Sequence, residues 1–155
     1  MSITENAGSM NSELFTDLKQ STPAYPLSPK TILFVDDDED IRALTKTFLE
    51  HEGYSVFCCG DAERAGHVFR SASRIDLLIT DFYMPKTSGM DLALELRQQN
   101  PRLPILLISG GFVWGDNLKR LLGEGWRFLG KPFALPELLA TVHAILGGGA
   151  MQAIA

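Results

Sequence analysis

Cysteine, long apolar stretches and secretion signals are scarce or missing in this sequence, and each absence excludes a class of protein. The two cysteines, Cys58 and Cys59, are adjacent, and this spacing fits neither a CxxC redox motif nor a zinc site. No apolar stretch is long enough to span a membrane, and the amino terminus lacks the basic-then-apolar order of a signal peptide. We therefore expect a cytoplasmic protein with reduced, buried thiols and no membrane insertion.

The chain also has fewer basic than acidic residues. The chain has 14 Lys and Arg against 19 Asp and Glu, its net charge is −5, and its basic residues are scattered along the sequence. Direct nucleic-acid binders usually cluster Lys and Arg to neutralise phosphates, so we expect no direct nucleic-acid ligand. The histidines His51, His67 and His143 lie far apart and match no metal motif, which favours packing or surface roles.

The sequence does contain short apolar runs that are typical of buried strands, and most of them end in a polar group. Four runs are followed by such side chains: 31–35 by Asp36, Asp37 and Asp38, 75–80 by Asp81, 103–108 by Ser109, and 126–129 by Lys131. A fifth run, 54–58, supplies the remaining strand. Because parallel strands end at one edge of a sheet, where the binding crevice forms, these groups are expected to meet at one site.

Between the runs, apolar residues recur with the spacing of amphipathic helices. One predicted apolar face comprises Ile41, Leu44, Phe48 and Leu49. The other helical patterns are formed by Ala65, Val68 and Phe69, by Leu92, Ala93 and Leu96, by Leu118, Leu121 and Leu122, and by Leu135, Leu138, Leu139, Val142 and Leu146. Asp61 and Ser88 suit helix N-caps. The alternation predicts an α/β fold, a (βα)5 doubly wound sandwich with a five-stranded parallel sheet and helices on both faces.

The length of 155 residues fits a single domain with terminal extensions. Residues 1–29 are rich in Ser, Thr, Asn and Pro, so we expect a flexible leader, in which residues 10–19 could form a short helix when docked. The domain is expected over residues 30–147, and a short tail over residues 148–155.

The three consecutive carboxylates Asp36, Asp37 and Asp38 repel one another at neutral pH unless a cation lies between them. Oxygen ligands select a hard ion, and Mg²⁺ is the first candidate. The alternative is that Asp37 or Asp38 caps the following helix, since acidic residues are common at helix starts.

Residues 30–147 resemble the receiver domain of bacterial two-component response regulators, stand-alone type. Four motifs occur in the order of that family: 33–37 (LFVDD), 80–85 (TDFYMP) followed by 88–90 (SGM), 108–110 (ISG), and 130–133 (GKPF). The resemblance implies a flavodoxin-like sheet with strand order 2-1-3-4-5.

This resemblance assigns a role to each residue of the acidic site. It makes Asp81 the phosphoacceptor, with a phosphoryl group supplied by a sensor histidine kinase or a histidine phosphotransfer protein. It implies that Asp37 binds Mg²⁺ directly, Asp36 directly or through water, and Tyr83 through its backbone carbonyl. Asp38 lies just beyond the matching pair, and we expect it to be a helix cap.

The resemblance also assigns the groups that sense the phosphate. Lys131 would contact the phosphoryl oxygens, Ser109 would be the switch hydroxyl, and Phe128 would be the paired aromatic switch residue. Their alternative interpretations are a surface lysine, an ordinary strand-end serine and a core phenylalanine. The implied function is a phosphorylation-dependent switch that catalyses its own phosphorylation and dephosphorylation without being a metabolic enzyme. It would signal to a downstream protein through the surface of residues 110–146 or relay phosphate.

Two other functions fit parts of the sequence. A haloacid-dehalogenase-like phosphatase would use Asp36 and Asp38 as nucleophile and general acid, but it also needs an acidic metal-binding pair after its lysine, and only Glu137 follows Lys131. A receiver-like binding module without phosphorylation would be favoured by the loss of an acidic ligand, and none is lost.

Overall fold

The computed structural model describes residues 28–111, 115–123 and 125–147, so the expected leader and tail lie outside the described residues, apart from residues 28 and 29. The elements follow one another as β1 (Thr31–Val35), α2 (Glu39–His51), β2 (Ser55–Cys59), α3 (Ala62–Ser71), β3 (Leu77–Asp81), α4 (Gly89–Gln99), β4 (Ile105–Ser109), α5 (Asp116–Gly123), β5 (Arg127–Gly130) and α6 (Leu135–Leu146). All strand pairs are parallel, in the order β2-β1-β3-β4-β5, which confirms the predicted fold.

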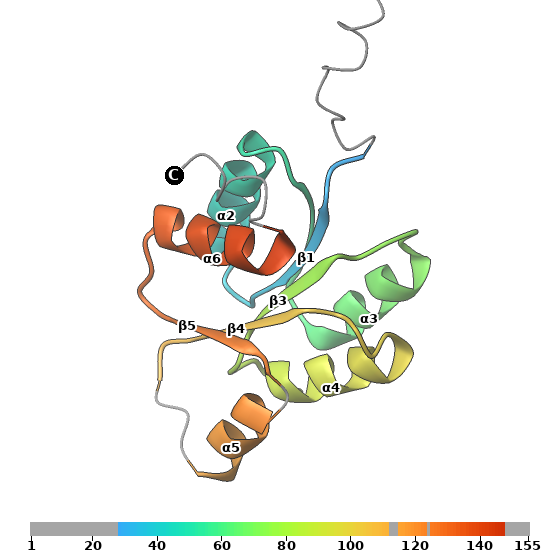
Figure 1. Ribbon diagram of the computed structural model, residues 1–155, viewed down its shortest axis with the longest axis vertical. Helices are drawn as coiled ribbons and strands as arrows, with labels where there is room; N and C mark the ends of the chain where they lie inside the picture. The colour runs from blue at the N-terminus through green and yellow to red at the C-terminus, as the bar shows by residue number, and fades with distance from the viewer. Residues whose placement is uncertain (1–27, 112–114, 124, 148–155) are drawn as a thin grey trace, which may run out of the picture.

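The sheet is the central layer, with helices on both faces (Figure 1). Alternate residues of β1 point to opposite faces: Ile32 and Phe34 pack with α2 and α6, whereas Leu33 and Val35 pack with α3 and α4. β3 and β4 are buried throughout, as strands covered on both faces should be. The two apolar cores therefore hold the carboxyl ends of the strands at one edge.

Four strands begin later than the apolar runs suggested: β2 is shifted by one residue, to Ser55–Cys59, and the later starts of β3, β4 and β5 each have a local cause. β3 starts at Leu77 because Asp76 uses its carboxylate to accept a hydrogen bond from the Thr31 backbone (2.8 Å). β4 starts after Pro104, which has no N–H to donate to a strand. β5 starts after Trp126, whose N–H donates to the carbonyl of Leu121 in α5 (3.3 Å).

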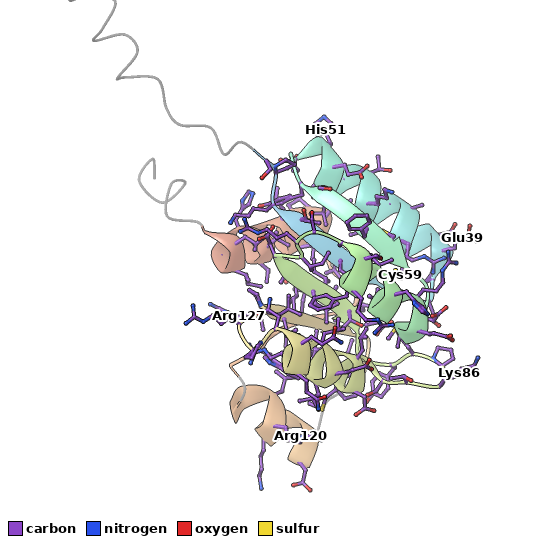
Figure 2. The ribbon with its side chains drawn as sticks, turned by 90° about the vertical axis from the view of Figure 1, so that its right-hand side faces the viewer. Glu39, His51, Cys59, Lys86, Arg120 and Arg127 are labelled. Atoms are coloured by element: carbon purple, nitrogen blue, oxygen red, sulfur yellow. The ribbon has the colours of Figure 1, made fainter. Side chains whose placement is uncertain are left out.

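The predicted caps are present. The side chains of Asp38, Asp61 and Ser88 accept hydrogen bonds from the first turns of α2, α3 and α4, and Pro136 lies in the first turn of α6. α2 runs from Glu39 to His51, both labelled in Figure 2. The expected apolar face of α2 was wrong at one position: Leu44 is 60% exposed, and Thr45 is buried in its place beside the expected Leu49.

None of the helices in the described part of the chain combines the length and the apolar character that crossing a membrane requires.

The contrast between Leu106 and Leu44 allows a matched test of the core. Leu106 is fully buried in β4, so Leu106→Ala should lower the free energy of unfolding by about 2–5 kcal/mol. Leu44→Ala makes the same chemical change at an exposed site and should cost no more than about 0.5 kcal/mol. Urea unfolding of both variants measures the difference, and equal losses would contradict this packing.

Candidate functional site

The ends of four strands place polar groups at one edge of the sheet. The Lys131 ammonium, at the end of β5, lies 2.8 Å from Asp36 Oδ2 after β1 and 2.9 Å from Asp81 Oδ2 at the end of β3. Ser109 ends β4 between β3 and β5 and is buried. Residues up to 95 positions apart in the sequence therefore meet at the place that the strand order dictates.

Three carboxylates form a cluster that could hold a metal ion. Asp36, Asp37 and Asp81 each offer an oxygen, and these oxygens all lie within 4.8 Å of one another. Asp36 and Asp81 are buried, whereas Asp37 is exposed and can be reached from solvent. One ammonium cannot neutralise three carboxylates, and an all-oxygen donor set with an open side fits a hard cation such as Mg²⁺.

Backbone contacts hold the β1–α2 loop in place. The Asp36 N–H donates to the carbonyl of Cys59 (3.1 Å), and Asp36 Oδ1 accepts from the Asp38 N–H (2.9 Å). Arg42, one turn into α2, donates through Nη1 to the Asp36 carbonyl (2.6 Å). The carboxylate of Asp38 accepts from the N–H groups of Asp40 and Ile41, as a helix cap does. These contacts fix Asp36 and Asp38, and the exposed Asp37 contributes its carboxylate to the cluster from the solvent side.

The backbone of Asp81 is held by a close approach of α4. The Phe82 N–H donates to Ile108 in β4, and the Gly89 N–H donates back to the Phe82 carbonyl (2.9 Å). A Cβ atom on residue 89 would lie 1.9 Å from the Asp81 carbonyl oxygen, so only glycine fits there. Gly89 therefore positions Asp81, and the sequence showed it only as part of a motif.

Burial and charge oppose each other in this site. Burial raises the pKa of the Asp81 carboxyl, the hydrogen bond and charge of Lys131 counteract this, and the nearby charge of Asp36 adds to the rise. Burial alone would lower the pKa of Lys131, but its hydrogen bonds to Asp36 and Asp81 outweigh that effect and raise it. Lys131 therefore binds its proton more tightly than a free lysine does, and the surroundings of Asp81 disfavour the ionised form of its carboxyl group.

The two expected switch residues, Ser109 and Phe128, have different surroundings. Ser109 Oγ accepts from the Gly111 N–H (3.1 Å) and donates to the Gly111 carbonyl (3.3 Å), so its hydroxyl is engaged within its own loop. The alternative of a core phenylalanine is wrong, because Phe128 is 44% exposed.

Tyr83 contacts both Asp81 and the start of the β4–α5 loop. The Tyr83 N–H donates to Asp81 Oδ1 (3.3 Å), while a Cβ atom on Gly111 would lie 3.3 Å from the Tyr83 ring. The Tyr83 ring thus lies against the β4–α5 loop, a contact that no sequence signal indicated.

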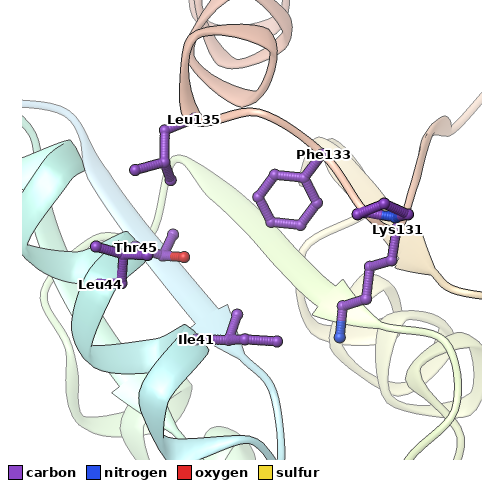
Figure 3. Close-up of a pocket in the computed structure, with 7 residues that line it drawn as sticks. Ile41, Leu44, Thr45, Lys131, Phe133 and Leu135 are labelled. Atoms are coloured by element: carbon purple, nitrogen blue, oxygen red, sulfur yellow. The ribbon is translucent and has the colours of Figure 1, made fainter.

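An apolar groove opens beside Lys131, between α2 and the start of α6 (Figure 3). Its volume is about 390 Å³, and we call it the α2–α6 groove. Its lining comprises Ile41, Leu44, Thr45, Lys131, Pro132, Phe133 and Leu135. The exposed Leu44 of α2 therefore belongs to a surface depression next to the acidic cluster.

Comparison with known proteins agrees with this geometry. The family model of the response regulator receiver domain matches residues 32–143. The chain belongs to this family. Its helices and strands also superimpose on solved receivers. One is the chemotaxis protein CheY4 of Vibrio cholerae, with a TM-score of 0.70, 28% identity, and coverage of 77% of this chain and 100% of that one. Another is a CheY-like receiver of Methanospirillum hungatei, with a TM-score of 0.72, 26% identity, and coverage of 81% and 99%.

Curated relatives are larger proteins. The transcriptional regulatory protein CpxR of Escherichia coli is 38% identical over 118 residues, which make up 74% of this chain and 48% of CpxR. The probable transcriptional regulatory protein TcrX of Mycobacterium tuberculosis is 31% identical over 118 residues, 76% of this chain and 50% of TcrX. This receiver chain spans about half the length of these relatives, and their names describe transcriptional regulators.

The raised pKa of Asp81 predicts how stability depends on pH. Folding disfavours the ionised carboxylate, so Asp81 reduces stability above its folded pKa, and this penalty disappears below its unfolded pKa. Asp81→Asn should therefore raise the melting temperature at pH 7 without divalent metal by a few degrees, and the gain should shrink as the pH falls. Asp61→Asn, which replaces one good helix cap by another, should show no such trend. Thermal melts of both variants from pH 3 to 8 measure the change in melting temperature. A gain in Asp81→Asn that increased as the pH fell would contradict the raised pKa of Asp81.

Proposed function

We propose that this receiver is a phosphorylation-dependent switch that accepts a phosphoryl group on Asp81. The observation that carries the proposal is the position of the Lys131 ammonium, 2.8 and 2.9 Å from Asp36 and Asp81, beside a cluster of three carboxylates. Such an arrangement supplies a carboxylate nucleophile and a fixed positive charge in the same crevice. The donor would be the phosphohistidine of a sensor kinase or a phosphotransfer protein in the cytoplasm.

In the transfer, an Asp81 carboxylate oxygen attacks phosphorus, the bond from phosphorus to the histidine nitrogen breaks, and the nitrogen keeps the electron pair. Lys131 Nζ lies 2.9 Å from Asp81 Oδ2, so it is within reach of oxygens bonded to a phosphorus on that carboxylate. As a point charge it would stabilise the negative charge of the acyl phosphate. Hydrolysis by water would return the free carboxylate, so the chain would contribute its own catalytic groups to both steps.

The same carboxylates would hold Mg²⁺. Asp37 and Asp81 would bind it directly, Asp36 directly or through water, and the Tyr83 backbone carbonyl would complete the protein ligands. When bound, the ion would neutralise the phosphoryl oxygens during the transfer. Asp36 is held at four points, by Lys131, the Asp38 N–H, the Cys59 carbonyl and Arg42, and is therefore preorganised for this role.

Output would pass through the face made of α5, β5 and α6. The Ser109 hydroxyl bonds only within its own loop in the described part of the chain, and a phosphoryl group on Asp81 would offer it a stronger, charged acceptor. Its movement would draw Gly110 and Gly111 with it and change the packing around the exposed Phe128. A downstream protein that binds this face would then bind with a different affinity, or the phosphoryl group would be transferred to a relay protein.

A phosphatase that uses Asp36 and Asp38 is disfavoured by the described contacts. The Asp38 carboxylate accepts two backbone hydrogen bonds at the start of α2, and it is absent from the cluster of Asp36, Asp37 and Asp81. A binding module that is never phosphorylated would have the same fold, so phosphorylation itself must be tested.

Asp81 should be the only phosphorylated residue. Incubation with a small phosphodonor and Mg²⁺ should add one phosphoryl group to the chain and none to Asp81→Asn. Asp61→Asn changes an exposed helix cap that is not a member of the cluster, and this variant should be phosphorylated like the original chain. Intact-mass spectrometry reads the result, and a mass shift that persisted in Asp81→Asn would refute the assignment. No shift in any chain would favour the binding module.

Metal binding should depend on Asp37. Removing one of three carboxylates should weaken Mg²⁺ binding by at least tenfold in Asp37→Asn, since each direct ligand contributes charge to the site. Asp40→Asn removes a nearby charge on the exposed surface of α2 and should change the affinity by less than about threefold, because surface charges are screened by salt. Isothermal titration calorimetry gives both affinities, and equal effects would mean that general electrostatics holds the ion.

A further inference from the structure

A second groove lies between α4 and α5, on the opposite face of the sheet from the α2–α6 groove. It is lined by Leu94, Arg97, Gln98, Pro101 and Arg120, has a volume of about 420 Å³, and is called here the α4–α5 groove. Arg97 is fixed in its wall, because its Nε donates to the Leu103 carbonyl (3.0 Å) and its guanidinium carbon lies 5.8 Å from the centre of the Trp126 ring. The proposed function makes no use of this groove.

The groove is basic in a chain that is acidic. Among the described residues its lining includes two guanidinium groups, those of Arg97 and Arg120, and no carboxylate, although the whole chain carries a net charge of −5. Arg120 extends from α5 at the lower end of the molecule in Figure 2, is exposed, and forms no hydrogen bond or ion pair with the described residues. The acidic side chains of the two helices that form its walls are Asp91, Glu95 and Asp116, and none of them lines it. The groove therefore suits an occupant that is both acidic and apolar.

Such a segment precedes the domain in the same chain. Residues 13–18 read Glu-Leu-Phe-Thr-Asp-Leu, with carboxylates at Glu13 and Asp17 and apolar side chains at Leu14, Phe15 and Leu18. In a helix, residues 14, 15 and 18 share one side, and Glu13 and Asp17 lie one turn apart beside them. We propose that residues 10–19 dock in the α4–α5 groove, with their carboxylates near Arg120 and their apolar side chains on Leu94 and Pro101.

The chain can reach the groove. β1 begins at the amino edge of the sheet, where the Thr31 carbonyl accepts from the Asp76 N–H and the Pro104 carbonyl accepts from the Leu78 N–H. The start of β1 and the 101–104 turn at the groove thus lie on the same edge, two strand spacings or about 10 Å apart along the sheet. The nine residues from position 20 to 28 span up to about 30 Å when extended.

The α2–α6 groove is the poorer match for this segment. It lies beside Lys131 at the carboxyl edge of the sheet, and α2 begins with Glu39 and Asp40 after Asp37 and Asp38. Those carboxylates would repel Glu13 and Asp17. Position and charge therefore both favour the α4–α5 groove.

Docking there would bear on the switch, and this part of the inference rests on the proposed function. α5 forms one wall of the groove and also belongs to the α5-β5-α6 output face. A segment held between α4 and α5 would stabilise one placement of α5, so that phosphorylation and docking would influence each other reciprocally.

The docking is tested in the full chain and without phosphorylation, so its failure would leave the proposed function untouched. Amide NMR shifts are compared between the original chain and the triple variant Leu14→Ser, Phe15→Ser and Leu18→Ser. The changes should concentrate at residues 94–101 and 119–121 and at the Trp126 indole, and should not depend on protein concentration. Changes restricted to the leader, changes around the α2–α6 groove, or shifts that vanish on dilution would each overturn the proposal.

A charge exchange provides the second measurement. Arg120→Glu should abolish at least half of the leader-dependent shift change, and adding Glu13→Arg and Asp17→Arg should restore it. Arg127→Glu makes the same change of charge on β5, outside the groove lining, where Figure 2 shows the side chain pointing away from the molecule, and it should leave the shifts in place. Equal losses in Arg120→Glu and Arg127→Glu, or no recovery in the exchanged chain, would contradict docking at this groove.

Discussion

The contact between the Lys131 ammonium and the carboxylates of Asp36 and Asp81 is the interaction around which the rest of the site is organised. These carboxylates are almost completely buried and lie close enough to repel each other. A buried carboxylate without a partner would be strongly unfavourable, and the ammonium provides the partner in the metal-free protein. The ion pair also links the side chains that follow or end β1, β3 and β5, at the edge where the chemistry would occur.

The fold supplies the rigidity that this arrangement requires. β3 and β4 are buried along their whole length, and the capped start of α2 together with Arg42 holds the loop that carries Asp36. On the other side, the missing side chain of Gly89 lets α4 touch the backbone of Asp81. The charged groups therefore sit on elements that cannot easily move apart to relieve repulsion. Under the proposed function, the changes on phosphorylation would instead take place at Gly110 and Gly111 and at the exposed face around Phe128.

The surroundings of the sheet differ at its two edges. The carboxyl edge combines the acidic cluster with the apolar α2–α6 groove, and under the proposed function this combination would suit the partner that donates the phosphoryl group. The amino edge leads to the α4–α5 groove with its two guanidinium groups. The proposed function and the proposed docking would together give this receiver separate surfaces for donor, output and leader, and α5 would couple two of them because it borders both the groove and the output face.

The sequence by itself determined the order of strands and helices, the caps at Asp38, Asp61 and Ser88, and the polar group at each strand end. These features follow from local patterns: apolar runs bury strands, and short polar side chains satisfy the first N–H groups of helices. The convergence of Asp36, Asp81 and Lys131 was also predictable, because parallel strands share an edge. Only the tertiary structure decided that Leu44 faces a groove, that Gly89 must lack a side chain, and that the scattered basic residues Arg97 and Arg120 face one groove. The physical reason is that each of these depends on where a second element packs, and a local pattern contains no information on the distance to a neighbour that is remote in the chain.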